Sequence, residues 1–240
     1  MKSYALICAY NEEKTAIEVI KSTLKYVDKV IFVNDGSKDS TFELAQKEFG
    51  SNKKVIIISY IKNRGKGYAM ITGFRCFSKE NGDILVTLDA DRQHNPKEIP
   101  VVISLVKKGV SDIVIGIKNK VSTYDQPITR NFLAKFSSGM LYLSSGGHLF
   151  VDDVSSGFRC YSKKAVRSIL PLLKTEDYGI ELEILQAAIK KSLKITQVEV
   201  SCNYKYGKKQ SLPKIASGYL KFGMRHRNEI IKNIPNLLLK

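Results

Sequence analysis

The sequence predicts an α/β fold in which a mostly parallel sheet is flanked by helices. Short apolar runs alternate with segments of helical periodicity along most of the chain. These runs are apolar throughout, which is typical of strands covered by helices on both faces. A polar cluster follows each of the first four runs, as expected where parallel strands end and ligands bind. These three observations together define the fold class.

The strand-like runs are short and rich in β-branched residues, and they lie at residues 4–9, 29–33, 55–59, 84–88, 112–116, 158–161 and 195–200. Helical patterns connect them, at residues 17–24, 39–49, 69–77, 96–109, 128–143, 163–173 and 181–191, with a last helix from about residue 212. No repeat or low-complexity linker interrupts the chain. We therefore expect one catalytic domain over residues 1–211 and an amphipathic helical extension over residues 212–240.

The composition is that of an ordinary globular protein with a strong excess of basic residues. Among 240 residues, 39 Lys and Arg face 23 Asp and Glu, which gives a formal net charge of +16. Such a charge indicates an anionic partner, which could be phosphorylated substrates, an anionic membrane surface or nucleic acid. The four cysteines form no CxxC pair, which favours free thiols in a reducing compartment over disulfides or zinc. No leader or membrane-spanning segment is expected, since the chain enters a strand at once and has no run of eighteen apolar residues.

The central stretch of the chain is residues 83–94, which read DILVTLDADRQH. Side chains two apart on an extended chain point to the same side, so Asp89, Asp91 and Gln93 can offer oxygens to one point. Oxygen ligands suit Mg²⁺ or Mn²⁺, which commonly share their coordination with substrate phosphates. The same residues would also suit a solvated acidic turn, because Asn95 and Pro96 make a good helix start. Both interpretations stay open at this point.

Five motifs, taken together, resemble the family 2 glycosyltransferases of the GT-A fold, in particular the dolichyl-phosphate mannose synthase and polyprenyl-phosphate glycosyltransferase branch. The motifs occur in the family's order and spacing, and they are AYNEE (9–13), VNDGSKDST (33–41), NRGKGYA (63–69), LDADRQHNP (88–96) and DVSSGFRCYS (153–162). The resemblance implies an inverting, metal-dependent transfer of a sugar from a nucleotide sugar, of the GDP-mannose or UDP-glucose type, to a polyprenyl or dolichyl phosphate.

The resemblance also implies roles on the donor side. The expected donor-binding residues, including the one that would contact the base or ribose, are Tyr10, Asn11, Glu12, Asp35, Lys66 and Asp89. The metal that bridges the donor diphosphate would be held by Asp89, Asp91 and Gln93, with Asp91 expected to be essential for catalysis. Lys66 could add positive charge at the same oxygens, although a solvated lysine in a glycine-flanked turn fits the pattern as well.

On the acceptor side the resemblance implies a group of cations and hydroxyls for the lipid phosphate, namely Lys118, Arg130, Ser137 and Arg159. Arg130 is the expected catalytic cation, because an anionic phosphate nucleophile needs placement rather than a base. Asp153 could be a base for a hydroxyl acceptor, or an acid that fixes the following turn. The chain departs from the family at Lys118, where an arginine is usual, and the late basic motif survives only loosely within residues 204–211.

The last helix places apolar Leu212, Ile215, Tyr219 and Phe222 beside basic Lys214, Lys221 and Arg225. This pattern suits either a surface of anionic lipid or packing on the chain's own domain. The resemblance favours a cytoplasmic protein at the cytoplasmic face of a membrane. The alternatives are a soluble glycosyltransferase with a hydroxyl acceptor, an inactive binding module and, more remotely, a nucleic-acid-binding protein, for which no basic–aromatic signature is present. His94 could support the acidic cluster from behind, but it is expected at the surface, where a helix begins.

Overall fold

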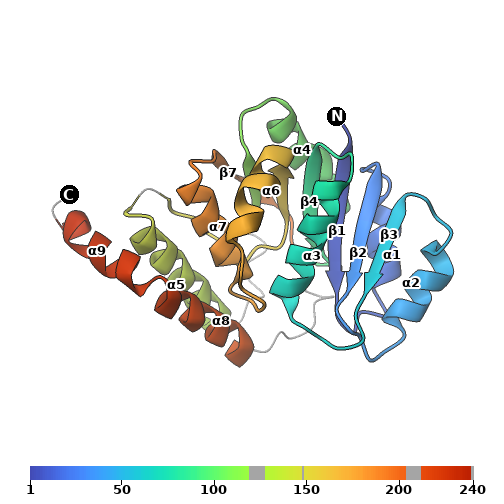
Figure 1. The fold of residues 1–240 in the computed structure, drawn as a ribbon, viewed down its shortest axis with the longest axis horizontal. Helices are drawn as coiled ribbons and strands as arrows, with labels where there is room; N and C mark the ends of the chain where they lie inside the picture. Colours follow the sequence, from blue (N-terminus) through green and yellow to red (C-terminus); the bar gives the residue numbers. More distant parts are fainter. Residues whose placement is uncertain (119–127, 148, 204–211, 239–240) are drawn as a thin grey trace.

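A computed structural model describes residues 1–118, 128–147, 149–203 and 212–238. The described residues form a seven-stranded sheet in the order β3-β2-β1-β4-β6-β5-β7 (Figure 1). Its strands are β1 (Ser3–Ala9), β2 (Lys29–Asn34), β3 (Val55–Ser59), β4 (Ile84–Asp89), β5 (Ile113–Lys118), β6 (Arg159–Ser162) and β7 (Ile195–Val200). β6 runs antiparallel to both of its neighbours, and the other pairings are parallel. The predicted mostly parallel α/β fold is confirmed.

Helices connect the strands and continue beyond the sheet. They are α1 (Ala16–Thr23), α2 (Thr41–Phe49), α3 (Lys66–Lys79), α4 (Ile99–Lys107), α5 (Ile128–Ser144), α6 (Lys163–Ile169), α7 (Ile180–Lys190), α8 (Leu212–Arg225) and α9 (Arg227–Leu238). Short 3₁₀ turns at Pro96–Glu98 and Leu170–Leu172 precede α4 and follow α6. The single final helix expected from the sequence is thus two helices that meet at His226.

The sheet is covered on both faces because its strands alternate between two apolar clusters. In β1, Tyr4 and Leu6 belong to one cluster, which also contains residues of α3, α5, α6, α7 and α8. Ala5 and Ile7 belong to the other cluster, with residues of α1, α2 and α4. Side chains of successive strand residues point to opposite faces. This explains why the strands read as continuous apolar runs in the sequence.

The apolar stripe of α8 packs on the same core as the sheet. Ile215, Tyr219 and Phe222 are buried and belong to the first cluster, and α8 contacts α5 and α7. The C-terminal helix α8 therefore uses this stripe for packing on the chain's own domain. None of the helices in the part of the chain that the structure describes has the length and apolar character needed to cross a bilayer.

Local caps agree with the sequence pattern at two helix starts. The side chain of Asn95 accepts a hydrogen bond from the Lys97 backbone N–H, and Pro96 takes the first position of the turn that leads into α4. Ser162 ends β6 and accepts from the Ala165 N–H at 3.0 Å, so one hydroxyl closes the strand and caps α6. The Asn95 cap follows the end of β4 that carries Asp89, whereas Ser162 pairs with Ile84 at the other end of that strand.

Candidate active site

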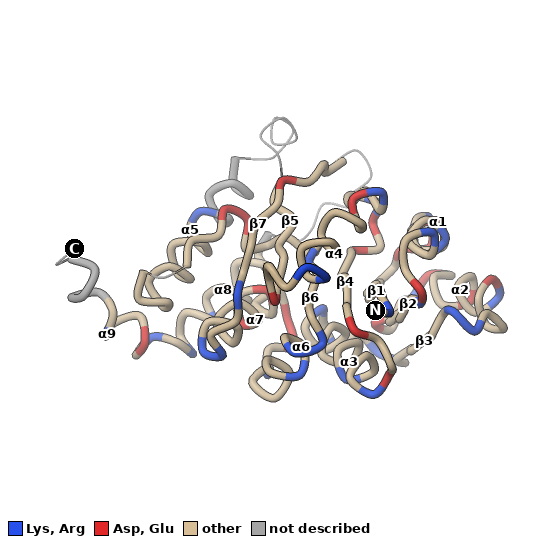
Figure 2. The backbone as a smooth tube through the Cα atoms, turned by 90° about the horizontal axis from the view of Figure 1, so that it is seen from above, with Lys and Arg blue, Asp and Glu red and all other residues tan. Residues whose placement is uncertain are grey.

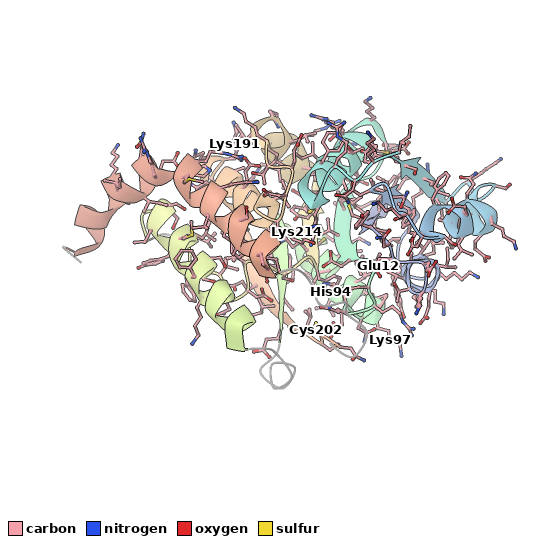
Figure 3. The ribbon with its side chains drawn as sticks, turned by 90° about the horizontal axis from the view of Figure 1, so that it is seen from below. Glu12, His94, Lys97, Lys191, Cys202 and Lys214 are labelled. Carbon is pink, nitrogen blue, oxygen red and sulfur yellow. The ribbon has the colours of Figure 1, made fainter. Side chains whose placement is uncertain are left out.

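A cavity of about 860 Å³ opens at the carboxyl ends of β1, β2 and β4. Four of the polar motifs seen in the sequence meet there, and a second wall comes from the loop before α7 and from α8. The lining residues from the motifs are Cys8, Ala9, Tyr10, Asn11, Glu12, Asp35, Asn63, Arg64, Gly65, Lys66, Ala69, Asp89, Ala90 and Asp91; the second wall contributes Glu176, Asp177, Tyr178, Pro213, Lys214, Ser217 and Lys221. Figure 3 shows Lys214 at the start of α8, on the side toward the segments that carry Glu12 and His94.

Asp35 fastens the loop between β3 and α3. Its carboxylate accepts hydrogen bonds from the backbone N–H groups of Arg64 (2.8 Å) and Gly65 (2.9 Å) and from the side-chain amide of Asn63 (2.8 Å). Gly65 has a φ of 98°, which only glycine adopts readily. Burial raises the pKa of Asp35, and the two backbone hydrogen bonds partly oppose that rise. Asp35, the expected donor-binding residue, thus fixes the backbone of residues 63–65, directly before Lys66.

The loop after β1 is tied to the loop after β2 in the same way. The backbone N–H of Asn11 donates to the Ser37 hydroxyl (2.9 Å), and the Asn11 side chain accepts from the Lys38 N–H (2.7 Å). The Glu12 N–H donates to the Thr41 hydroxyl at 2.8 Å. Tyr10 stays 38% exposed at the cavity wall. The loop expected to face the nucleotide is therefore anchored by hydrogen bonds to the loop after β2, which begins at Asp35.

A buried ion cluster occupies the base of the cavity. The Lys66 ammonium lies 3.0 Å from Oδ1 of Asp89 and 2.7 Å from Oε1 of Glu181. Burial alone would lower the pKa of Lys66, but the two carboxylates outweigh it and hold that pKa well above its usual range. For Asp89, burial acts to raise the pKa, yet Lys66 and His94 bring it well below the usual range. The Lys66 side chain is 16% exposed, so the solvated-turn interpretation of Lys66 is wrong.

Asp89 and Asp91 both line the cavity, but the chain between them is not extended. β4 ends at Asp89, and Arg92 adopts a φ of 64°, which turns the backbone. The Asp91 carboxylate accepts from the Gln93 N–H at 3.0 Å. Gln93 is buried and is not among the described residues that line the cavity. The expectation that three oxygens share one side therefore holds for the two carboxylates and not for Gln93.

The two carboxylates fit a hard divalent cation. Burial, followed by the negative charge of Asp89, raises the pKa of Asp91, which is the behaviour of a carboxylate pair that needs a cation. Among the described residues, no three side chains of His, Cys, Asp or Glu gather as a ready metal cage. Mg²⁺ and Mn²⁺ are often held by one or two carboxylates and complete their coordination with phosphate oxygens and water. The residues present therefore fit a metal that is shared with a diphosphate.

His94 is buried instead of lying at the surface, which corrects the expectation from sequence. Its ring stacks on Phe158 with centroids 5.5 Å apart, and its Nε2 lies 3.6 Å from Oδ2 of Asp89. That separation exceeds hydrogen-bonding range but is short for an electrostatic contact. An isolated antiparallel β-bridge joins the backbones of His94 and Cys202. His94 thus contacts the Asp89 carboxylate electrostatically through its Nε2.

Arg159 is enclosed by the turn that it was expected to present to the acceptor. Its side chain is fully buried and donates to the carbonyl oxygens of Ser156, Val154 and Glu181. A guanidinium used in this way holds the 153–159 turn against α7 and offers no charge to a ligand. The assignment of Arg159 to the acceptor phosphate is therefore corrected.

The remaining acceptor residues have mixed outcomes. Ser137 is fully buried, and its hydroxyl lies within hydrogen-bonding reach of Tyr219 beneath α8, so burial separates it from a ligand. Asp153 accepts from the backbone N–H and the hydroxyl of Ser155 at 3.1 and 2.6 Å, in agreement with the turn-fixing alternative. The side chains of Lys118 and Arg130 lie outside the described residues.

Sequence reasoning missed Glu181 and the basic side of α8. Glu181 reads as one residue of an amphipathic helix, and nothing in its neighbours marks it as part of a charged cluster. Lys214 and Lys221 share a helix face by their spacing, but that face was interpreted as a surface for lipid or solvent. The only signal was the basic stripe itself, and its direction depends on how α8 packs.

Comparison with known proteins identifies the class. The family model for glycosyl transferase family 2 matches residues 4–170. The chain belongs to this family and is a glycosyltransferase, which confirms the resemblance seen in the motifs.

Particular relatives extend over most of the chain. A UDP-N-acetylglucosamine–dolichyl-phosphate N-acetylglucosaminyltransferase of Methanococcus voltae is 32% identical over 216 residues, with 84% of this chain and 85% of the relative covered. An undecaprenyl-phosphate mannosyltransferase of Micrococcus luteus is 26% identical, with 84% and 83% covered. Among solved structures, glucosyl-3-phosphoglycerate synthase of Mycobacterium tuberculosis, crystallised with Mn²⁺ and UDP, aligns with a TM-score of 0.70 at 19% identity over 97% of this chain and 78% of that one. That likeness concerns the fold.

Proposed function

We propose that this glycosyltransferase moves a sugar from a nucleotide-diphosphate sugar to a polyprenyl or dolichyl phosphate, with Mg²⁺ or Mn²⁺ bound at Asp89 and Asp91. One observation carries the proposal: a single cavity has a carboxylate pair on its sheet side and the lysines of α8 on the opposite side. The carboxylate pair suits a metal bound to the donor diphosphate, and the lysines of α8 suit an additional anion, such as an acceptor phosphate. The relatives named above support the same acceptor class.

On the donor side, the chain's own residues place the diphosphate. The loops held by Asp35 and Asn11 form the wall for the nucleotide, and Lys66, at the start of α3, extends to Asp89. A bound divalent cation neutralises the negative charge that develops on the leaving diphosphate. Lys66 adds positive charge in a buried setting, where it acts more strongly than in water.

On the acceptor side, a phosphate nucleophile is already anionic near neutral pH and needs no strong base. It must be held beside another anion, which calls for cations on that side. The described cations of the second wall are Lys214 and Lys221, with the Ser217 hydroxyl between them on α8. Lys221 also pairs with Asp177 at 2.9 Å, which leaves Lys214 as the more available of the two. We propose Lys214 for the acceptor phosphate, with Arg130 and Lys118 as the further candidates.

The same proposal assigns a place of action. A polyprenyl phosphate resides in a membrane, so we propose a peripheral association with the cytoplasmic face. The buried stripe of α8 cannot serve this contact. The outer sides of α8 and α9 present Leu220, Met224 and Ile231, which are 57%, 67% and 62% exposed, beside basic residues. Exposed apolar side chains next to cations suit a surface of anionic lipid.

The direct test is incubation with a panel of nucleotide sugars, Mg²⁺ or Mn²⁺, and either a polyprenyl phosphate or the corresponding polyprenol. We expect mass spectrometry to detect a glycosylated lipid phosphate that depends on the metal. Transfer to the polyprenol or to a glycan hydroxyl, with none to the phosphate, would replace this proposal with the hydroxyl-acceptor alternative. A product in the presence of EDTA would overturn the role of the metal.

A further inference from the structure

The Lys66 ammonium already pairs with Asp89, one of the two carboxylates that we propose hold the metal. It lies 3.0 Å from Oδ1 of Asp89, and the three side chains of the cluster are largely enclosed, with exposures of 16% for Lys66, 24% for Asp89 and 4% for Glu181. A Mg²⁺ ion binds a carboxylate oxygen at about 2.0–2.1 Å. An ammonium and a divalent cation that share one buried oxygen repel each other with little screening from salt.

We propose that Lys66 is a resident counter-cation that competes with the metal for Asp89, and that Glu181 is the positioning residue that keeps Lys66 when the metal displaces it. The inference rests on the proposed function, because it takes the metal to bind at Asp89 and Asp91. It goes further because it assigns Lys66 as the cation that neutralises Asp89 in the metal-free enzyme. It also assigns a role to a buried carboxylate that the donor motifs do not contain.

Glu181 is placed to receive the displaced ammonium. It lies in the first turn of α7, is buried, and already holds Lys66 at 2.7 Å. Lys66 can therefore leave Asp89 and still remain paired with Glu181. A charged group left unpaired in such a site would be strongly unfavourable. Glu181 thus makes the exchange between Lys66 and the metal possible.

The exchange couples the metal to the nucleotide. Without a nucleotide, the metal has to compete with Lys66 for Asp89, and affinity for the metal alone is reduced. A bound diphosphate gives Lys66 a second anionic partner in the cavity and so favours its departure from Asp89. Because binding linkage is reciprocal, the metal raises the affinity for the nucleotide by the same factor.

The test measures Mn²⁺ binding directly, by electron paramagnetic resonance of free Mn²⁺, with and without UDP or GDP. Lys66→Met should lower the Kd for Mn²⁺ alone about tenfold, and the extra tightening by the nucleotide should shrink by a similar factor. Glu181→Gln should act in the opposite direction and weaken Mn²⁺ binding several-fold, because the ammonium then has Asp89 alone. Lys62→Met removes an exposed lysine of the preceding loop and should leave both values unchanged.

Opposite signs for the two variants distinguish this exchange from general damage to the site, which would weaken Mn²⁺ binding in both. An unchanged or weaker affinity in Lys66→Met overturns the inference, as does a tighter affinity in Glu181→Gln. If Lys66→Met does not fold, Lys66→Gln takes its place, and it should likewise bind Mn²⁺ more tightly than the unchanged protein while Glu181→Gln binds it more weakly. The readout needs no acceptor, so a failure to glycosylate polyprenyl phosphate would reject the proposed function and leave this result standing.

Discussion

Asp89 and Asp91 lie two residues apart, yet their surroundings shift their pKa values in opposite directions. Burial raises both, but Lys66 and His94 reverse the effect for Asp89 and bring its pKa well below the usual range. For Asp91, the charge of Asp89 adds to the rise, and the charges of His94 and Lys66 do not outweigh it. At neutral pH an ionised Asp91 is therefore held at a cost to the folded state. Such a cost is expected where a metal completes the site.

The first prediction follows from that cost. Asp91→Asn should reduce turnover by more than a hundredfold, about 2.7 kcal/mol or more of transition-state stabilisation, because the metal loses a charged ligand. The free energy of unfolding should stay equal or rise slightly, since a repulsive charge is removed. Steady-state kinetics and thermal melts without metal measure the two effects. Full activity of the variant, or a large loss of stability, would contradict the role of Asp91.

At the scale of elements, the loop before α7 joins the donor wall to the acceptor wall. The Glu176 carbonyl accepts from the Gly67 N–H of α3 at 3.0 Å. Glu183 of α7 accepts from the backbone N–H groups of Lys174 and Thr175 and also pairs with Arg225 of α8 at 3.2 Å. The start of α3, which carries Lys66, is thereby linked through one loop to α7 and α8.

The second prediction tests this close packing. A Cβ on Gly67 would lie 2.1 Å from the Thr175 carbonyl oxygen, so Gly67→Ala must push the loop away. We expect the free energy of unfolding to fall by about 1–3 kcal/mol. Gly139→Ala in α5 is the matched control, because nothing lies within 4 Å of the added Cβ. That change should stabilise the protein by about 0.5–1 kcal/mol through helix propensity. Chemical denaturation measures both, and equal shifts would contradict the packing argument.

The third prediction concerns α8 as the acceptor wall. Lys214→Gln should raise the KM for a polyprenyl phosphate at least fivefold and leave the KM for the nucleotide sugar unchanged, because Lys214 faces the cavity from the α8 side (Figure 3). Lys191→Gln is the control, since Lys191 is exposed at the end of α7 and does not line the cavity. A silent Lys214→Gln would move the acceptor role to Arg130 and Lys118.

At the scale of the whole molecule, the net charge of +16 is distributed over many elements. Figure 2 shows Lys and Arg along the tube from α2 to α8 instead of gathered on one element. Such a distribution gives general attraction to an anionic surface, which salt screens. Orientation on a membrane must then come from the exposed apolar side chains, which on α8 and α9 lie near the acceptor wall.

The fourth prediction separates these two contributions. The double change Leu220→Ser and Met224→Ser should reduce sedimentation with anionic vesicles several-fold and should leave transfer to a short, water-soluble polyprenyl phosphate intact. Val101→Ser, at a half-exposed position of α4, is the control for loss of an apolar side chain elsewhere. If vesicle binding is lost in high salt but is unaffected by the two changes in α8, charge alone attaches the protein to the membrane.

The sequence by itself determined the strands, the helices and the rim on which the polar motifs meet. Periodicity is a local property, and parallel strands bring their carboxyl ends to one edge, so Asp35, Lys66, Asp89 and Asp91 could be assigned to one site without coordinates. The family resemblance added the reaction class. It could do so because each of the five motifs is a contiguous stretch of the chain and is therefore readable without coordinates.

Only the tertiary structure decided which side chains turn toward that rim. Glu181 reaches Lys66 across 115 positions of sequence, from 66 to 181, and Lys214 faces the cavity because Ile215 and Tyr219 are buried on the core. Arg159 has the right charge at the right turn, but the packing of α7 encloses its guanidinium. Burial and direction arise from contacts between segments far apart in the chain. A local pattern does not encode those contacts, and the acceptor side depends on them.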